Sequence, residues 1–240
     1  MTYIFLKEFN SFLNSLIGYL VVGVFLVAMG LLMWVFPDSS VLNYGYADMD
    51  TIFSFGPYVF IFLVPAITMR SLAEEKKLCT LELLMTKPLT ERDIVLGKFF
   101  ASLLLLIFAL VPTVIFYLTI YQLGNPEGNV DTPGVIGSYI GMIFLGGVFC
   151  AIGIFASSIT PNQIVSFIVA AFLCFVIYLG FDSAAALFGQ GALLVKQFGI
   201  LYHYESMSRG LIDSRDLVYF LSVTTVMLLA AKIVLSSRSW

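Results

Sequence analysis

Six long apolar runs, separated by shorter polar segments, dominate the pattern of the chain. Each run approaches or exceeds the roughly 20 residues that a helix needs to cross the hydrocarbon core of a bilayer. A helix satisfies its own backbone hydrogen bonds in lipid, and the two-residue alternation of barrel strands is absent from these runs. The predicted transmembrane helices are Ser15–Phe36, Thr51–Met69, Phe99–Leu123, Val135–Ile159, Ile164–Phe181 and Leu217–Leu235.

The composition agrees with an all-α integral membrane protein. Hydrophobic residues make up 60% of the chain and charged residues only 11%, which lies outside the range of soluble domains. Lys232 is the one Asp, Glu, Lys or Arg residue within the six runs. Proton-driven and sodium-driven carriers usually hold ionisable groups inside the bilayer, so the pattern argues against a self-powered carrier. We expect the energy for any transport to come from a source outside this chain.

The basic residues are distributed unevenly between the loops, and this asymmetry predicts the orientation of the chain. With the N-terminus inside, the outer loops keep only Lys196, Arg209 and Arg215, beside most of the acidic residues. Six spans then place both termini in the cytoplasm. The cations on the cytoplasmic side are Lys7, Arg70, Lys76, Lys77, Lys87, Arg92, Lys98, Lys232 and Arg238.

The segment before the first run, from Tyr3 to Leu16, has apolar residues at helical spacing. It predicts an N-terminal interfacial helix that lies flat on the inner leaflet. A second interpretation, in which this segment simply begins the first span, stays open. A cleaved signal peptide is disfavoured, because the following apolar run is much longer than the roughly 7 to 15 residues of a signal sequence.

The most polar stretch of the chain, Glu74–Lys98, lies between the second and third spans. Good helix formers predict one amphipathic helix from Ser71 to about Met85. Charged side chains fall largely on the face away from its apolar stripe. The predicted stripe consists of Leu78, Leu81, Leu84 and Met85.

A sharp break is expected after this helix, because Pro88 cannot continue it. Thr90 and Asp93 then resemble a capping box, with Asp in place of Glu or Gln, and restart a helix that enters the third span. Force applied to such an elbow would reach the second and third spans. The alternative is a solvated loop whose cations only fix the topology.

Small residues and prolines mark positions inside the spans. Gly137 and Gly141 form a small-xxx-small pair that lets another helix approach closely, either within the chain or in a homodimer. Pro65 and Pro112 remove backbone donors from the second and third spans and are possible hinges. Ordinary tolerance of proline in membrane helices is the competing interpretation.

Sites for catalysis, metals or cofactors are not expected in this chain. His203 is the only histidine, and the three cysteines lack metal-ligand spacing. Gly97 and Lys98 do not form a phosphate loop, since Arg92 stands where its first glycine would be and Phe99 replaces its Ser or Thr. The chain alone is therefore not expected to hydrolyse ATP.

The polar stretch resembles the signature segment of the permease subunits of ABC type-2 transporters. That segment has an acidic pair, basic residues, Gly-Thr-Leu-Glu-Leu-Leu, a proline and a second helix that ends in Gly-Lys. Cys79 stands here where glycine is usual. The resemblance implies a cytoplasmic coupling helix that docks on an ATPase. Its coupling residues would be Glu74, Glu75, Lys76, Lys77, Thr80, Leu81, Glu82, Leu83, Leu84 and Pro88.

Two further stretches, Tyr121–Gly141 and His203–Ser222, resemble the gliding-motility permease branch GldF and, more loosely, the NosY-type permeases. The resemblance implies export or extrusion across the bacterial inner membrane, in support of gliding motility. The alternative function is an ATPase-driven assembly platform or mechanical anchor without a transported substrate.

The resemblance also implies an architecture and a set of partners. Residues 1–240 would form a single permease domain, with short outer helices between the fifth and sixth spans. The partners would be a cytoplasmic ABC ATPase, a second permease subunit in a homodimer or heteromer, and the lipid bilayer. ATP and Mg²⁺ would bind to the ATPase, and no nucleic acid is expected.

Overall fold

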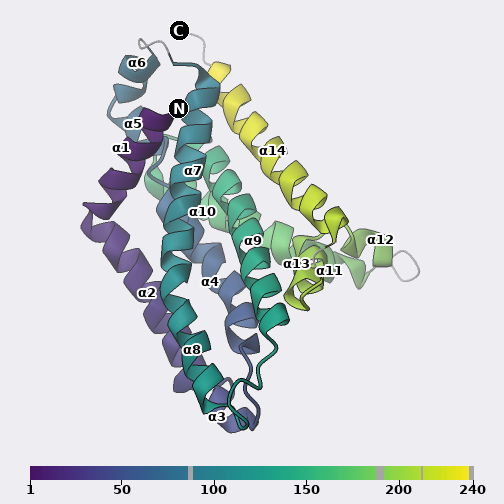
Figure 1. Ribbon diagram of the computed structural model, residues 1–240. Helices are drawn as coiled ribbons and strands as arrows, with labels where there is room; N and C mark the ends of the chain where they lie inside the picture. Colours follow the sequence, from purple (N-terminus) through teal and green to yellow (C-terminus); the bar gives the residue numbers. More distant parts are fainter. Residues whose placement is uncertain (86–88, 188–191, 212, 238–240) are drawn as a thin grey trace.

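The computed structural model describes residues 1–85, 89–187, 192–211 and 213–237, and it is all-helical within these ranges (Figure 1). The helices of the predicted spans are α2 (Leu16–Trp34), α4 (Asp50–Thr68), α7 (Glu91–Leu110), α8 (Val114–Leu123), α9 (Thr132–Ile159), α10 (Gln163–Phe175) and α14 (Ser214–Ser236). The other elements are α1 (Thr2–Leu13), α3 (Val41–Tyr44), α5 (Ala73–Lys77), α6 (Thr80–Met85), η1 (Val111–Thr113), η2 (Val176–Gly180), α11 (Phe181–Ala185), α12 (Ala192–Lys196) and α13 (Ile200–Ser208).

Within the described residues, five helical segments are long and apolar enough to cross a membrane. They correspond to the second to sixth predicted spans. The first predicted span corresponds to α2, which passes the same test only together with α1, at an angle of 66° to it. The five segments are Asp50–Lys77, Glu91–Leu123, Thr132–Ile159, Gln163–Ala185 and Ser214–Ser236.

Polar side chains fix where several helices begin. Thr90 accepts a hydrogen bond from the backbone N–H of Asp93, and the Asp93 carboxylate accepts one from the N–H of Thr90. This reciprocal pair confirms the predicted capping box at the start of α7. Asp131 and Asp213 cap α9 and α14 by accepting backbone N–H groups in the same way.

Helix α9 forms the centre of the bundle and contacts α4, α7, α10, α13 and α14. Its most apolar stretch is 78% buried, whereas that of α14 is only 11% buried. Close approach to α9 depends on small residues, because a Cβ at Gly146 would overlap Leu106 of α7 and one at Gly153 would overlap Thr68 of α4. The exposed apolar surface therefore lies mainly on the peripheral helices, as expected for a protein in lipid.

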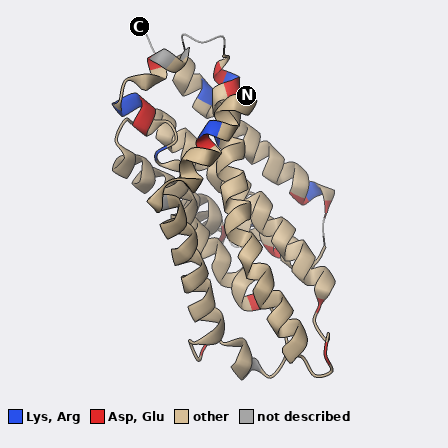
Figure 2. Ribbon diagram, turned by 60° about the vertical axis from the view of Figure 1, so that its left-hand side comes forward, with Lys and Arg blue, Asp and Glu red and all other residues tan. Residues whose placement is uncertain are grey.

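The two ends of the bundle differ in charge. Figure 2 shows basic and acidic segments gathered at the end where the N-terminus, α5 and α6 lie. The loops at the opposite end, residues 36–49 and 124–131, contain acidic residues and no Lys or Arg. We call α5 and α6 together the elbow, and the end that carries them the elbow end.

Candidate functional site

The elbow consists of two short helices where the sequence predicts one. The prediction of a continuous helix from Ser71 to Met85 is wrong, because α5 ends at Lys77 and α6 begins at Thr80. Cys79 lies between them with a φ of 55°, the only positive φ of a non-glycine residue in the described chain. This left-handed conformation favours glycine, which explains why glycine is usual at this position in the segment that the sequence resembles.

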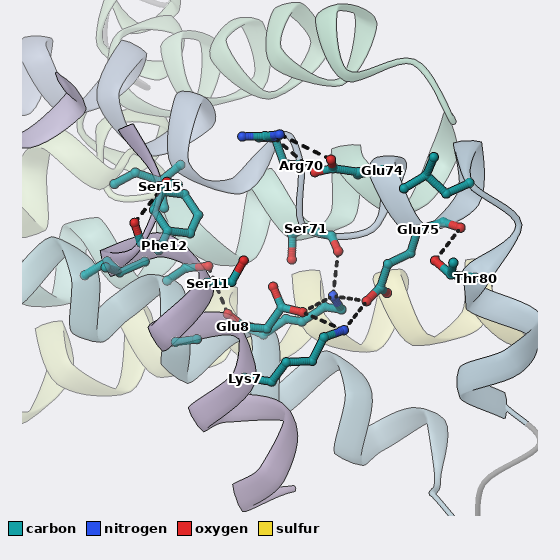
Figure 3. Close-up of a pocket in the computed structure, with 16 residues that line it drawn as sticks. Lys7, Glu8, Ser11, Phe12, Ser15, Arg70, Ser71, Glu74, Glu75 and Thr80 are labelled. Atoms are coloured by element: carbon teal, nitrogen blue, oxygen red, sulfur yellow. Dashed lines mark hydrogen bonds and ion pairs between the residues drawn. The ribbon is translucent and has the colours of Figure 1, made fainter. Parts of the chain in front are cut away.

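A buried lysine holds the elbow to the bundle. The amine of Lys98, in α7, lies 2.9 Å from a carboxylate oxygen of Glu8 in α1 and 3.0 Å from one of Glu75 in α5. It also donates a hydrogen bond of 2.6 Å to the carbonyl oxygen of Ser71. Figure 3 shows the carboxylates of Glu8 and Glu75, which come from two helices, pointing toward one another. The side chain of Lys98 is 1% exposed, and a lysine has three N–H donors, so the buried charge is fully paired.

A polar cavity of about 320 Å³ surrounds this cluster between α1, α5 and α7 (Figure 3). Three basic and three acidic side chains line it, and they pair with one another instead of leaving a net charge. Lys7 lies 3.5 Å from Glu75 at the exposed rim, and Arg70 lies 3.1 Å from Glu74 one helical turn away. Exposed pairs of this kind contribute little stability. The cavity therefore offers no excess of either charge to a ligand.

A second set of hydrogen bonds joins the elbow to α9. The hydroxyl oxygen of Ser157, near the end of α9, accepts hydrogen bonds from the backbone N–H groups of Leu72 and Ala73, both at 2.9 Å. The same hydroxyl donates to the carbonyl oxygen of Met69 at 3.2 Å, and the amine of Lys76 donates to the carbonyl oxygen of Ser158. The start of α5 is therefore bound to the central helix as well as to α1 and α7.

The predicted coupling residues separate into two groups. Lys77, Thr80 and Glu82 are exposed, as a docking surface requires. The remaining described side chains face the bundle to different degrees: Leu81 is buried at 3% exposure, whereas Glu74, Glu75, Lys76 and Leu84 are half-buried. Leu83 lies in α6 without a described side chain, and Pro88 lies outside the described residues.

The predicted apolar stripe of the elbow is interrupted. Leu81 packs into the core, but Leu78 is 63% exposed, because the left-handed residue Cys79 changes the direction of the chain between them. Helical periodicity across Ser71–Met85 therefore fails at Leu78 and Cys79, the two residues between α5 and α6, which we call the joint. Leu78 instead lies on the open surface beside the exposed side chains of α6.

The other predicted positions lie away from the elbow. A Cβ at Gly137 would meet the backbone of Gly210 and Met207, so this glycine lets the end of α13 approach α9 closely. Gly141 lies against Met207 and Tyr204 of the same helix. Pro65 lies within α4, and Pro112 lies in η1, a short 3-10 segment between α7 and α8. Their role as hinges stays a prediction.

Helix α13 is attached to the core by Tyr204, which the sequence analysis did not single out. Burial raises the pKa of the Tyr204 phenol well above its ordinary value, so its hydroxyl remains protonated. The hydroxyl donates a 2.7 Å hydrogen bond to the carbonyl oxygen of Phe53 in α4. This bond supports the short-helix region between α10 and α14 from within.

Sequence reasoning missed Glu8 and Ser157, because their partners lie 90 and about 85 positions away along the chain. A signal existed for Lys98, since a lysine at the start of an apolar span requires a partner. Nothing in the sequence identified that partner. Among the described residues, no group of three or more His, Cys, Asp or Glu side chains is arranged to hold a metal ion.

Comparison with known protein families finds a match that covers almost the whole chain. The model of a family described as ABC-2 family transporter protein matches residues 2–237. A search of curated proteins finds no significant match. The family match spans the elbow, the buried Lys98 cluster and every helix from α1 to α14.

Proposed function

The chain belongs to the ABC-2 transporter family, and on that premise we propose that it is a permease subunit whose elbow receives force from a separate ABC ATPase. Permeases of this family are multi-pass membrane proteins that work with a cytoplasmic ATPase. The membrane subunit is typically not catalytic. ATP and Mg²⁺ would bind to the ATPase, and this chain would convert its movement into a change in the helices.

The observation that carries this proposal is the construction of the elbow. Exposed side chains of α6 and the joint, both polar and apolar, form an open surface. In contrast, α5 is bound to α1, α7 and α9 by the contacts of Lys98, Ser157 and Lys76. A docking surface on α6, which is joined directly to the firmly held α5, transmits displacement, whereas a solvated loop would absorb it. Closure of the ATPase would thus move α4 and α7 directly, and α1 and α9 through these contacts.

Further parts of the proposal follow from the resemblance of two stretches to gliding-motility permeases. We propose that the protein acts in a bacterial inner membrane, with both termini and the elbow in the cytoplasm, and that residues 1–240 form one permease domain. The concentration of cations at the elbow end supports this orientation. A second permease subunit would complete a pathway for export, because the six helices of one chain provide little room for a transport pathway between them.

Glu82 provides a direct test of docking on the elbow. The change Glu82→Lys reverses an exposed charge of α6, so we expect co-purification of the ATPase to fall by at least about tenfold, equivalent to roughly 1.4 kcal/mol. Glu127→Lys is the matched control, since Glu127 is an exposed glutamate in the loop between α8 and α9. If both variants retain the ATPase equally, the elbow is not the docking site.

Transport itself is tested in vesicles that contain the whole complex. We expect ATP to drive accumulation or release of a compound, and expect the Glu82→Lys variant to lose this activity with insertion unchanged. ATPase binding without movement of lipid, glycan or protein candidates would favour the assembly platform instead.

A further inference from the structure

A second polar cluster, separate from the elbow, joins α12, α13 and α14 around His203. Nδ1 of His203 lies 2.7 Å from Oδ1 of Asp216 in α14. Nε2 lies 2.9 Å from the carbonyl oxygen of Gln197, just after α12. The ring of Tyr219 stacks on the imidazole with the centroids 4.0 Å apart. The imidazole is therefore fixed between two oxygen atoms from two other elements.

These two contacts determine how many protons the cluster holds. A peptide carbonyl and a carboxylate only accept hydrogen bonds, and a neutral imidazole has a single N–H to donate. Both hydrogen bonds can form together only if the imidazole carries two protons, or if Asp216 carries the second one. In either arrangement the cluster holds one proton more than a neutral histidine beside a carboxylate.

Burial makes this additional proton important. The side chain of Asp216 is 6% exposed, and its second oxygen, Oδ2, is buried without a hydrogen-bond partner in the described structure. Loss of the proton from His203 would leave a buried carboxylate beside a neutral ring, and an uncompensated buried charge is strongly unfavourable. The contact between His203 and Asp216 would then open, so that water reaches the Asp216 carboxylate.

We propose that His203 and Asp216 form a pH-sensitive clasp, in which the additional proton holds the turn of residues 196–199 against α14. The clasp is closed at acidic pH and opens as the pH rises. Histidine is the side chain that ordinarily exchanges a proton near pH 6.5.

The other contacts of this turn do not depend on such a proton. The hydroxyl of Tyr219 donates to the carbonyl oxygen of Phe198 at 2.6 Å, and the amine of Lys196 lies 2.8 Å from Asp182. The hydrogen bond to Asp182 raises the pKa of Lys196, so this amine keeps its charge. Of these three contacts, only the one from His203 requires the additional proton of the cluster.

The surroundings give His203 a route for proton exchange with water. A cavity of about 540 Å³ opens beside His203 and Asp216. Helix α9, which packs against α13, has no acidic or basic residue, and η2 contributes only Tyr178. The other titratable or charged groups nearby are Tyr202, Asp213, Arg215 and Tyr219 around the cavity and Glu205 on the exposed face of α13.

The sign of the pH effect follows from the proton count. The closed clasp binds one proton more than the open form, so a rise in pH favours the open form. The ratio of closed to open molecules is expected to fall by up to about tenfold per pH unit, the limit for release of one proton.

Spin labels on α12 and α14 measure this opening. Leu194 and Val218 are both exposed, at 67% and 66%, so cysteines placed there accept labels without disturbing the core. The background change Cys79→Ser removes the exposed native thiol, while Cys150 and Cys174 are buried. In proteoliposomes of the full chain, we expect one short distance at about pH 5.5 and a growing longer population at about pH 8.5, on either side of the histidine range.

Two variants identify the group responsible. His203→Gln, which cannot titrate, should give a distance distribution that is independent of pH, and Lys196→Gln should retain the wild-type pH response. If His203→Gln does not fold, Asp216→Asn should abolish the response instead. An unchanged wild-type distribution across the pH range, or a full response in the folded His203→Gln variant, would overturn the clasp.

Discussion

The two helices of the elbow are adjacent in the sequence but differ in how they are held. In α5, Ala73 is fully buried, Glu75 is bound to Lys98, and Lys76 is bound to the end of α9. In α6, Thr80 and Glu82 are exposed, and Leu81 alone is described as buried. One charged segment therefore serves two purposes: α5 anchors the elbow, and α6 presents a surface to a partner.

The joint between the two helices permits this division. Cys79 in its left-handed conformation ends α5, so α6 does not have to continue along the same axis. A continuous helix would place the stripe that includes Leu78 and Leu81 on one face. The break instead buries Leu81 and leaves Leu78 on the surface.

Loss of the buried amine is expected to have the largest effect on the anchor. Lys98→Met would leave Glu8 and Glu75 without their buried counter-charge and with only the exposed Lys7 nearby. We expect it to lower the free energy of unfolding by about 3 kcal/mol, the low end for a broken buried pair, because both carboxylates retain some contact with water. Thermal denaturation in detergent measures this. Adding Glu75→Gln should recover part of the loss; no recovery would show that the charge cluster is not what holds α5.

Ser157→Ala is expected to have a smaller effect, because it removes the acceptor for two backbone N–H groups at the start of α5. Leaving buried donors unpaired costs about 1–3 kcal/mol, measured by the same denaturation. Ser222→Ala is the matched control, since the exposed hydroxyl of Ser222 donates only to a carbonyl oxygen of its own helix. Equal stability of the two variants would exclude Ser157 as an anchor.

Cys79→Gly should stabilise the joint. Glycine relieves the roughly 1–2 kcal/mol cost of a left-handed residue but loses about 0.5–1 kcal/mol through the greater freedom of the unfolded chain. We expect a net gain of about 0.5–1 kcal/mol in thermal denaturation. Cys79→Ser retains the Cβ and should show no gain; a loss of stability in the glycine variant would contradict the left-handed joint.

Lys77→Glu should have the smallest effect on stability, within about 0.5 kcal/mol, because Lys77 is exposed at the end of α5. Its effect on binding of the ATPase should nevertheless be measurable by co-purification, as a weaker complex at unchanged thermal stability. If thermal stability falls together with binding of the ATPase, Lys77 supports the fold of the elbow and does not contribute only to docking.

The sequence predicts the helical framework well, because the patterns that indicate a helix and its first residue lie within a short stretch of the chain. Apolar runs locate the candidate spans, and Thr90 with Asp93 locates the start of α7. The capping box involves residues three positions apart, so the pattern contains everything that it needs.

The anchor of the elbow lies beyond such local reasoning. Glu8, Ser157 and Lys98 meet only when α1, α7 and α9 pack together, and no periodicity indicates that juxtaposition. The single predicted helix over Ser71–Met85 failed for a related reason. Its residues are good helix formers, but the tertiary contacts of α5 and the turn at Cys79 outweigh that local preference.

The native cysteines provide the most direct test of the elbow as the docking site. Cys79 is exposed, whereas Cys150 and Cys174 are buried, so a membrane-impermeant thiol reagent should report on the joint without any substitution. We predict that Cys79 reacts from the cytoplasmic face of inverted membrane vesicles and reacts more slowly when the ATPase is bound. Labelling from the opposite face, or the same rate with and without the ATPase, would contradict the account.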